Sequence, residues 1–376
     1  MLLSEDHLAV QDAVRQYVQA EIAPHAAAWD KSHQFPAAQL KGLAALGCYG
    51  VAVPTEWDGA GLDYLALALI LEEIGAGDGA TSTVVSVNNC PVCSILMAYG
   101  NDDQKQRFLK PLARGDMLGA FCLTKPQVGS EAGGLKTTAV LDGDHYVLNG
   151  VKQFITSGKN GDVAIVMAVT DKAAGKRGIS AFLVPTTTPG YTVARVEDKM
   201  GQHASDTAQI VFEGCRVPVE NRIGDEGQGL KIALSGLEGG RIGIASQSLG
   251  MARAAFDCAL AYSKQRKAFG VAIFEHQAIQ FKLAEMAMKI EAARQLIWHA
   301  ASLKDAGRPC LKEAAMAKLM ASEMAEAVCS GAIQVLGGYG YLSDFPVERI
   351  YRDVRVCQIY EGTSEVQKIL IGRALS

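Results

Sequence analysis

The chain has 376 residues, of which 49% are hydrophobic and 20% are charged, and its formal net charge is -4. This length exceeds the usual size of a single core, so two or three packed subdomains are expected. The composition is that of a globular protein, and the small negative charge argues against a nucleic-acid-binding surface and favours a small or acyl substrate.

Neither a membrane span nor a targeting segment is expected. The longest charge-free stretch, residues 80–101, contains several serines and asparagines and is too polar to cross a membrane. The first residues match neither a secretory signal nor a transit peptide. These features predict a cytoplasmic protein, or a mitochondrial matrix protein if the source is eukaryotic.

Nine cysteines are spread from Cys48 to Cys357 without regular spacing, which is typical of reduced thiols. Cys90 and Cys93 have the C-x-x-C spacing of a redox or zinc pair. Because no second pair follows, burial in the core is the favoured interpretation for both.

The predicted elements fall into three regions along the chain. Apolar residues at helical spacing run up to Pro24, a loop with Pro54 and residues 57–61 follows, and a second helix covers residues 64–74. Alternation over residues 137–148, with Asp142 and Gly143 as a hairpin signal, begins a β region with further strands at 163–169, 179–184 and 209–217. The predicted domains are residues 1–118 (helical), 119–228 (β) and 229–376 (helical).

The third region is helical again. Its clearest period places apolar residues at 279, 283, 286, 290, 293 and 297, and the segment 307–309 ends that helix. Another helix is expected from about residue 311 to Gly337 and Gly338, and a last one near the C-terminus.

One carboxylate, Glu361, lies in a glycine-flanked turn just before this last helix. Ser364 and Gln367 match a capping box, which predicts Ser364 as the N-cap and leaves Glu361 outside the helix. The N–H groups and dipole of a helix start favour negative charge, which suits a reaction that forms an enolate there. Taken alone, however, the turn is more often an acidic surface loop.

Three further segments each have two interpretations. Residues 121–130 form a turn rich in hydroxyl groups and glycine, which presents N–H groups to a flat polar ring or is a plain connector. Residues 154–158 combine an aromatic side chain with hydroxyl groups, which fits either the edge of such a ring or core packing by Phe154. Residues 334–340 allow close backbone approach to a ligand, or are an ordinary helix end.

Two arginines are further candidates for a binding site, whereas the histidines are not candidates for a metal site. Arg241 follows Gly239 and Gly240 in a helical pattern, where each glycine costs ~1 kcal/mol, so either a large group or a second helix is expected to pack closely there. Arg266 either clamps a pyrophosphate or is solvated. The histidines show no metal-binding spacing, so no metal is predicted, and no dinucleotide fingerprint, P-loop or G-x-S-x-G elbow occurs.

Taken together in this order, the segments resemble the acyl-CoA dehydrogenase family over the whole chain. The strongest likeness is residues 351–363, which resemble the family's C-terminal signature with its catalytic glutamate at Glu361. Some relatives carry the base just before the arginine that matches Arg241, where this chain has Gly240. The resemblance implies a mostly helical α+β fold with an N-terminal helical domain, a central β-barrel-like domain and a C-terminal four-helix bundle.

The resemblance also implies FAD as cofactor and an acyl-CoA thioester as substrate. It assigns the flavin site to Phe121, Leu123, Thr124, Gly129, Ser130, Phe154, Ile155, Thr156, Thr363, Ser364 and Glu365. It assigns the adenine and pyrophosphate of a neighbouring subunit's FAD to Arg266, Phe269, Gln277, Gln334, Val335, Gly337 and Gly338. It assigns substrate contacts to Ser130, Glu238, Arg241, Tyr360 and Gly362. Lys125 and Glu131 depart from the family's usual Glu and Asp, and both bear on the geometry of the flavin loop.

The implied reaction is α,β-dehydrogenation to the trans-2-enoyl-CoA. Glu361 would remove the α-proton, flavin N5 would take the β-hydride, and an electron-transferring flavoprotein would accept the electrons. The resemblance further implies a homotetramer, a dimer of dimers, and a short straight or branched acyl chain, from fatty-acid β-oxidation or branched-chain amino-acid catabolism. The alternatives are an acyl-CoA oxidase, whose usual extra C-terminal domain is not found here, and a non-catalytic family member.

Overall fold

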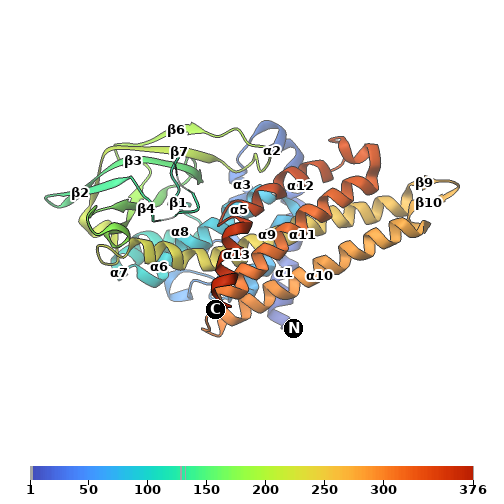
Figure 1. Cartoon of the computed structure of the whole chain (residues 1–376), viewed down its shortest axis with the longest axis horizontal. Coiled ribbons are helices and arrows are strands. Elements are labelled where there is room, and N and C mark those ends of the chain that lie inside the picture. Colours follow the sequence, from blue (N-terminus) through green and yellow to red (C-terminus); the bar gives the residue numbers. More distant parts are fainter. Residues whose placement is uncertain (1–2, 128, 132, 376) are drawn as a thin grey trace.

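The computed structural model describes residues 3–127, 129–131 and 133–375. Its elements run from helices through strands to helices, which confirms the predicted order (Figure 1). The strands of the middle region gather at one end of an elongated molecule, and the long C-terminal helices extend to the other end (Figure 1).

Short helices make up the N-terminal region, as predicted. The first helical stretch ends at the turn that contains Pro24, and the second begins at Tyr64, where the side chain of Asp63 caps the helix by accepting from Ala66 N–H. The elements are α1 (Glu5–Tyr17), η1 (Val18–Ile22), α2 (Ala26–Ser32), α3 (Ala37–Ala45), η2 (Thr55–Trp57), α4 (Tyr64–Gly77), α5 (Gly79–Val87), η3 (Asn88–Cys93), α6 (Ser94–Tyr99), α7 (Asp102–Gln104), η4 (Lys105–Leu109) and α8 (Lys110–Arg114).

The middle region is a β domain built on one sheet with the order β6-β7-β3-β2-β4-β5-β8, in which β1 pairs with β4. The predicted hairpin joins β2 to β3 and turns at Gly143, whose φ is +63°. Strand β6 and strand β8 lie at the ends of the path, so the described strands do not close into a ring. The elements are β1 (Gly119–Cys122), β2 (Thr138–Asp142), β3 (His145–Thr156), β4 (Val163–Val169), η5 (Gly175–Gly178), β5 (Ile179–Pro185), β6 (Tyr191–Val196), β7 (Thr207–Pro218), η6 (Val219–Asn221) and β8 (Arg222–Ile223).

Three long helices dominate the C-terminal region, and their apolar stripes form its core. The predicted stripe of α10 is buried at Leu283, Met286, Ile290, Ala293 and Ile297. The elements are α9 (Gly229–Gln265), β9 (Lys267–Ala268), β10 (Val271–Ala272), η7 (Ile273–Glu275), α10 (Gln277–Asp305), α11 (Leu311–Leu336), η8 (Gly337–Tyr341), α12 (Val347–Val354), η9 (Arg355–Gln358) and α13 (Ser364–Arg373).

Helix α4 ties the N-terminal region to this bundle. It is buried on nearly all sides and packs on α1, α9 and α10. Its one charged pair, Glu72 and Glu73, is also buried, and arginines of the three surrounding helices neutralise it: Arg15 of α1, Arg253 of α9 and Arg294 of α10. A buried charge requires such partners, so these ion pairs fix α4 between its neighbours.

Helix α9 approaches α4 so closely that a side chain would not fit at Gly250, where a Cβ would lie 2.0 Å from the Glu72 carbonyl oxygen. The same helix carries the consecutive residues Gly239, Gly240 and Arg241 in its N-terminal half. Tight packing of α9 therefore sets the position of the predicted site residues.

All nine cysteines are free, and only Cys258 is partly exposed. Cys90 and Cys93 are buried in η3, and the Cys90 thiol lies 3.8 Å from the Tyr64 hydroxyl. The core interpretation of this pair is thus confirmed. Among the described helices, none has both the length and the apolar character needed to cross a membrane.

Candidate active site

Glu361 lies in the turn between η9 and α13, outside the helix as predicted. Both Glu361, at φ +54°, and Gly362, at φ +90°, have left-handed backbone conformations. The predicted capping box is wrong by one residue: Thr363 is the N-cap and accepts from Val366 N–H at 3.4 Å, whereas Ser364 is already the first helical residue. Thr363 offers a hydroxyl group just as Ser364 does, so the sequence pattern did not separate them.

The carboxylate of Glu361 points at α9. A Cβ added to Gly240 would lie 2.6 Å from Glu361 Oε2 and 2.9 Å from its Cδ. The large group that the paired glycines predicted is therefore the proposed base itself. Gly239 makes room in the same way for Cys90 Sγ and Tyr64, at 2.9 Å and 3.1 Å from its ideal Cβ.

Burial also changes the chemistry of Glu361. Its Oε2 atom is enclosed and has no hydrogen-bond partner among the described residues. This burial raises the pKa of Glu361 to about 7, although the nearby cations Arg241 and Lys318 favour the ionised form. A carboxyl group with a pKa near neutrality can accept a proton and is suited to general base catalysis.

Arg241 shares this interior space. Its side chain is 5% exposed, and its Nε and Nη1 atoms have no hydrogen-bond partner within the described part of the chain. Burial lowers the pKa of Arg241, while Glu361 and Glu238 oppose that change. The guanidinium and the carboxylate therefore interact through their charges without a direct hydrogen bond.

Tyr360 and Glu238, both predicted to contact substrate, have their polar groups engaged within the protein. The Tyr360 hydroxyl accepts from Gln247 Nε2 at 2.9 Å and Gln202 Nε2 at 3.3 Å. The Glu238 carboxylate accepts from Lys304 Nζ at 3.1 Å. The hydroxyl of Tyr360 and one oxygen of Glu238 are therefore already engaged within the protein.

The predicted flavin loop is attached to strand β3. Thr124 O accepts from Gln153 N–H at 2.9 Å, and Leu123 O accepts from Lys152 Nζ at 3.2 Å. Lys152 is fully buried, and burial lowers its pKa to about 7. Lys125, one of the departures from the family pattern, is also buried, which lowers its pKa. The loop thus contains one buried lysine and is bonded by a second, from β3. Val128, within the loop, lies outside the described residues.

The end of β3 presents an aromatic ring to the outside. Phe154 has a left-handed backbone, with φ +58°, and its side chain is 62% exposed, so the core-packing alternative is wrong. Ile155 differs from expectation, because its side chain is 1% exposed and packs inside the sheet. Alternation along a strand sends neighbouring side chains to opposite faces, so only the backbone of Ile155 remains for a ring contact.

These residues fit a flat, polar aromatic cofactor. Phe154 supplies an exposed ring beside a loop rich in hydroxyl groups. At the start of α13, Ser364 Oγ is buried and has no hydrogen-bond partner among the described residues. An orphan hydroxyl at a helix N-terminus can bond an external polar group.

The second predicted group lies at the opposite end of the helical bundle, around the β9–β10 hairpin (Figure 1). Phe269, in the hairpin turn, is 97% exposed, and the Arg266 guanidinium lies 5.8 Å from the centre of the Tyr339 ring. Val335 is 5% exposed and belongs to the bundle core, so its side chain is unsuited to a cofactor contact. The other members of this group are Gln277, Gln334, Gly337 and Gly338.

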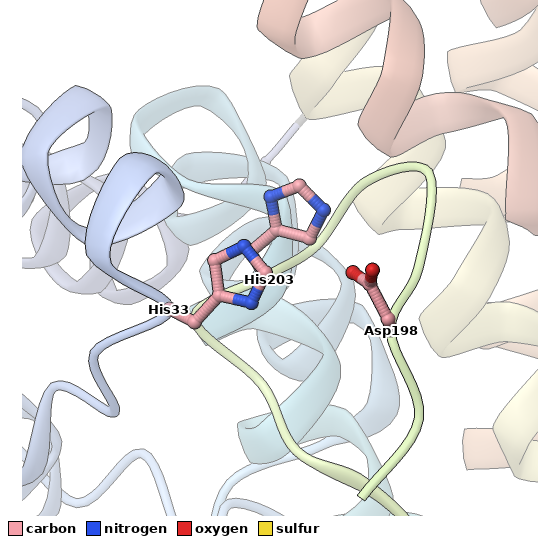
Figure 2. Close-up of side chains that lie close together, drawn as sticks. All are labelled: His33, Asp198 and His203. Carbon is pink, nitrogen blue, oxygen red and sulfur yellow. The ribbon is translucent and has the colours of Figure 1, made fainter.

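The structure also brings together three residues that sequence spacing did not connect, His33, Asp198 and His203 (Figure 2). The two imidazole rings are stacked, 4.2 Å apart and 15° from parallel. Lone pairs that lie in two parallel planes do not converge on one ion. Both ring nitrogens of His203 also face oxygen atoms, Asp30 Oδ1 at 2.8 Å and Lys199 O at 2.5 Å. This arrangement does not fit a metal site.

Sequence reasoning missed two residues that touch the Glu361 turn, Lys318 of α11 and Gln367 of α13. Lys318 Nζ donates to Gly362 O at 2.7 Å, and Gln367 Nε2 donates to the same oxygen at 2.8 Å. A signal was present, since Lys318 interrupts the otherwise alanine-rich buried stripe that holds Ala314, Ala321 and Ala325. A charge on an apolar face calls for a partner.

Comparison with known proteins assigns the family. Three family models match in order: the acyl-CoA dehydrogenase N-terminal domain at residues 4–116, the middle domain at 120–215 and the C-terminal domain at 227–376. The chain belongs to the acyl-CoA dehydrogenase family, whose cofactor is FAD.

Three relatives illustrate the likeness. The short-chain specific acyl-CoA dehydrogenase of rat mitochondria is 48% identical over 369 residues, which cover 98% of this chain and 90% of the relative. The structure of butyryl-CoA dehydrogenase from Megasphaera elsdenii superposes with a TM-score of 0.97 at 41% identity, over 100% of this chain and 99% of that one. A glutaryl-CoA dehydrogenase from Mycobacterium smegmatis, solved with FADH2, gives a TM-score of 0.94 at 33% identity, over 100% and 95% of the two chains.

Proposed function

We propose that this protein catalyses the FAD-dependent α,β-dehydrogenation of a short acyl-CoA thioester to the trans-2-enoyl-CoA, with Glu361 as the base. The observation that carries this assignment is the carboxylate of Glu361, whose enclosed Oε2 lies against Gly240 and whose pKa is raised by burial to about 7. Family membership supports the reaction type, because the chain has the base in its C-terminal turn and glycine at the alternative position.

In this mechanism Glu361 accepts the α-proton of the thioester at a carboxylate oxygen. Arg241 and Lys318 favour its ionised form before the reaction, and burial makes it basic enough to take the proton. The N–H of Glu361 donates to the thioester oxygen and acidifies the α-carbon, as in an oxyanion hole. FAD supplies the hydride acceptor for the β-hydrogen.

A short acyl chain is supported by the packing between α9 and the η3–α6 segment. A Cβ at Gly236 would lie 2.7 Å from Pro91 Cβ and 2.8 Å from Ile95 Cδ1, so these elements are in near contact one turn from Gly240. Such close packing would limit the depth available to an acyl chain bound at Glu361. Straight and branched short chains both fit this argument, and either fatty-acid β-oxidation or branched-chain amino-acid catabolism is a compatible role.

The partners follow from the second group of residues. We propose a homotetramer, a dimer of dimers, in which Arg266, Phe269 and Gln277 meet the adenine and pyrophosphate of a neighbouring subunit's FAD. The extreme exposure of Phe269, at 97%, supports this, because it leaves the whole ring available for contact with another surface. We further propose an electron-transferring flavoprotein as electron acceptor, and the bacterial cytoplasm or the mitochondrial matrix as location.

The test is an anaerobic titration of the purified, FAD-loaded protein with a panel of acyl-CoA thioesters. A yellow protein that bleaches with short acyl-CoA supports the dehydrogenase, and catalytic efficiency across the panel ranks chain length and branching. Rapid reoxidation by air would indicate an acyl-CoA oxidase instead. A lack of bleaching with every thioester would indicate a non-catalytic binding protein.

A further inference from the structure

The turn that carries Glu361 has an unfavourable backbone that needs external support. Glu361 is one of seven described residues other than glycine with a positive φ, and Gly362 continues the left-handed conformation. A residue with a side chain is disfavoured there and keeps this conformation only where its surroundings hold it.

Two buried side chains meet this turn from different helices. Lys318 of α11 and Gln367 of α13, both 0% exposed, donate to Gly362 O at 2.7 Å and 2.8 Å. Gln367 Nε2 also lies 3.2 Å from Glu361 O. The carbonyl oxygens of the Glu361–Gly362 peptide and of the next peptide, Gly362–Thr363, are therefore both bonded.

From these contacts, we infer that Lys318 and Gln367 form a clamp on the Glu361 turn, and that Lys318 is a positioning residue for the base. The inference rests on the proposed role of Glu361. The two residues have different roles. Gln367 contributes hydrogen bonds alone, while Lys318 contributes a hydrogen bond and a positive charge.

The cost of burying Lys318 supports a role beyond packing. No carboxylate lies within ion-pair distance of its amine among the described residues, and an apolar side chain would continue the alanine-rich face of α11. Burial lowers the pKa of Lys318 to about 8, while Cys357, Glu361 and Glu365 oppose this and Arg241 reinforces it. The titratable groups around the amine thus come from α9, η9, α13 and the turn itself.

The experiment compares Lys318→Met with Lys312→Met in the FAD-loaded enzyme. Lys312 lies on the same helix, is largely outside the core and pairs with Glu313, so its variant controls for the loss of a lysine. Lys318→Met is expected to lower kcat by at least about tenfold with little change in KM, because the base is displaced. The acid limb of the kcat/KM profile is expected to move up by about one pH unit, since a nearby cation is lost.

Gln367→Met separates the two parts of the clamp. It is expected to lower kcat without moving the acid limb, because no charge is removed. Wild-type kcat and a wild-type pH profile in Lys318→Met would overturn the inference, and wild-type kcat in Gln367→Met would overturn the clamp even if Lys318→Met failed to fold.

Hydrogen exchange distinguishes a failure of the clamp inference from a failure of the proposed function. The amides of residues 361–366 are expected to exchange faster in both clamp variants than in the wild type or Lys312→Met, whatever the substrate proves to be. Unchanged exchange in both variants would refute the clamp. An absence of turnover in the wild type would refute the function alone.

Discussion

Replacing Gly240 with alanine tests the contact between α9 and the proposed base. The new Cβ would lie 2.6 Å from Glu361 Oε2, whereas ordinary van der Waals contact begins at 3.4 Å. The carboxylate must therefore retreat by about 0.8 Å. The atom that has to move is the end of a flexible side chain, so the protein fold can accommodate the change while the base cannot keep its place.

Gly240→Ala is expected to lose much of its activity without losing stability. Misplacement of a reacting group by about 1 Å can cost on the order of 10²-fold in rate. In contrast, alanine in place of glycine in a helix interior contributes about 0.5–1 kcal/mol to stability. Gly240→Ala should therefore lower kcat by on the order of 10²-fold while its Tm stays the same or rises.

The assay measures kcat with a short acyl-CoA, FAD content and Tm for each variant. Gly372→Ala is the matched control, because Gly372 lies in α13 and a Cβ there would meet nothing within 4 Å. The control should keep wild-type kcat. If Gly240→Ala kept wild-type kcat with full FAD, or lost stability in place of activity, the placement of the carboxylate against α9 would be wrong.

Further outcomes are expected. Glu361→Gln should keep FAD and lose about 10²–10⁴-fold in kcat, and an unchanged kcat in this variant would place the base elsewhere. The kcat/KM of the wild type should fall as the pH drops below about 7, because the base must be ionised. Glu73→Gln breaks buried ion pairs with Arg15 and Arg253 and should lower the free energy of unfolding by about 3–5 kcal/mol in denaturant titrations. Burial raises the pKa of Glu73, but the two arginines outweigh this effect, so the pKa of Glu73 is lowered overall. The stabilisation should therefore fade as the pH falls into the acid range. A pH-independent difference in unfolding free energy between the wild type and Glu73→Gln would contradict this prediction. Phe269→Asp should shift the protein to a smaller assembly in light scattering, and an unchanged mass would exclude the hairpin from the interface.

The sequence predicted what depends on local pattern. The apolar period of α10, the hairpin at Gly143 and the position of Glu361 outside the last helix are all confirmed, because each follows from residues close together in the chain. The paired glycines of α9 also correctly indicated that something large packs against them.

What the sequence did not predict involves pairing between distant segments. Lys318 and Gly362 are 44 residues apart, and His33 stacks on His203 from a different region of the chain. Helical periodicity reports which face is buried but not which residue of another element it meets. The misplaced N-cap has a different cause, since Thr363 and Ser364 are both good caps and only the backbone geometry decides between them.

The proposed base, Glu361, is thus positioned by the helical bundle more than by its own turn. Helix α9 limits its reach at Gly240, α11 holds the following carbonyl through Lys318, and α13 holds it through Gln367. Each of these helices also contributes to the same bundle or packs on it. A substitution that shifts α9 against α11 should therefore change kcat even when it lies far from Glu361. Such a shift alters the distance between Gly240 of α9 and Lys318 of α11, and these two residues set the position of the carboxylate.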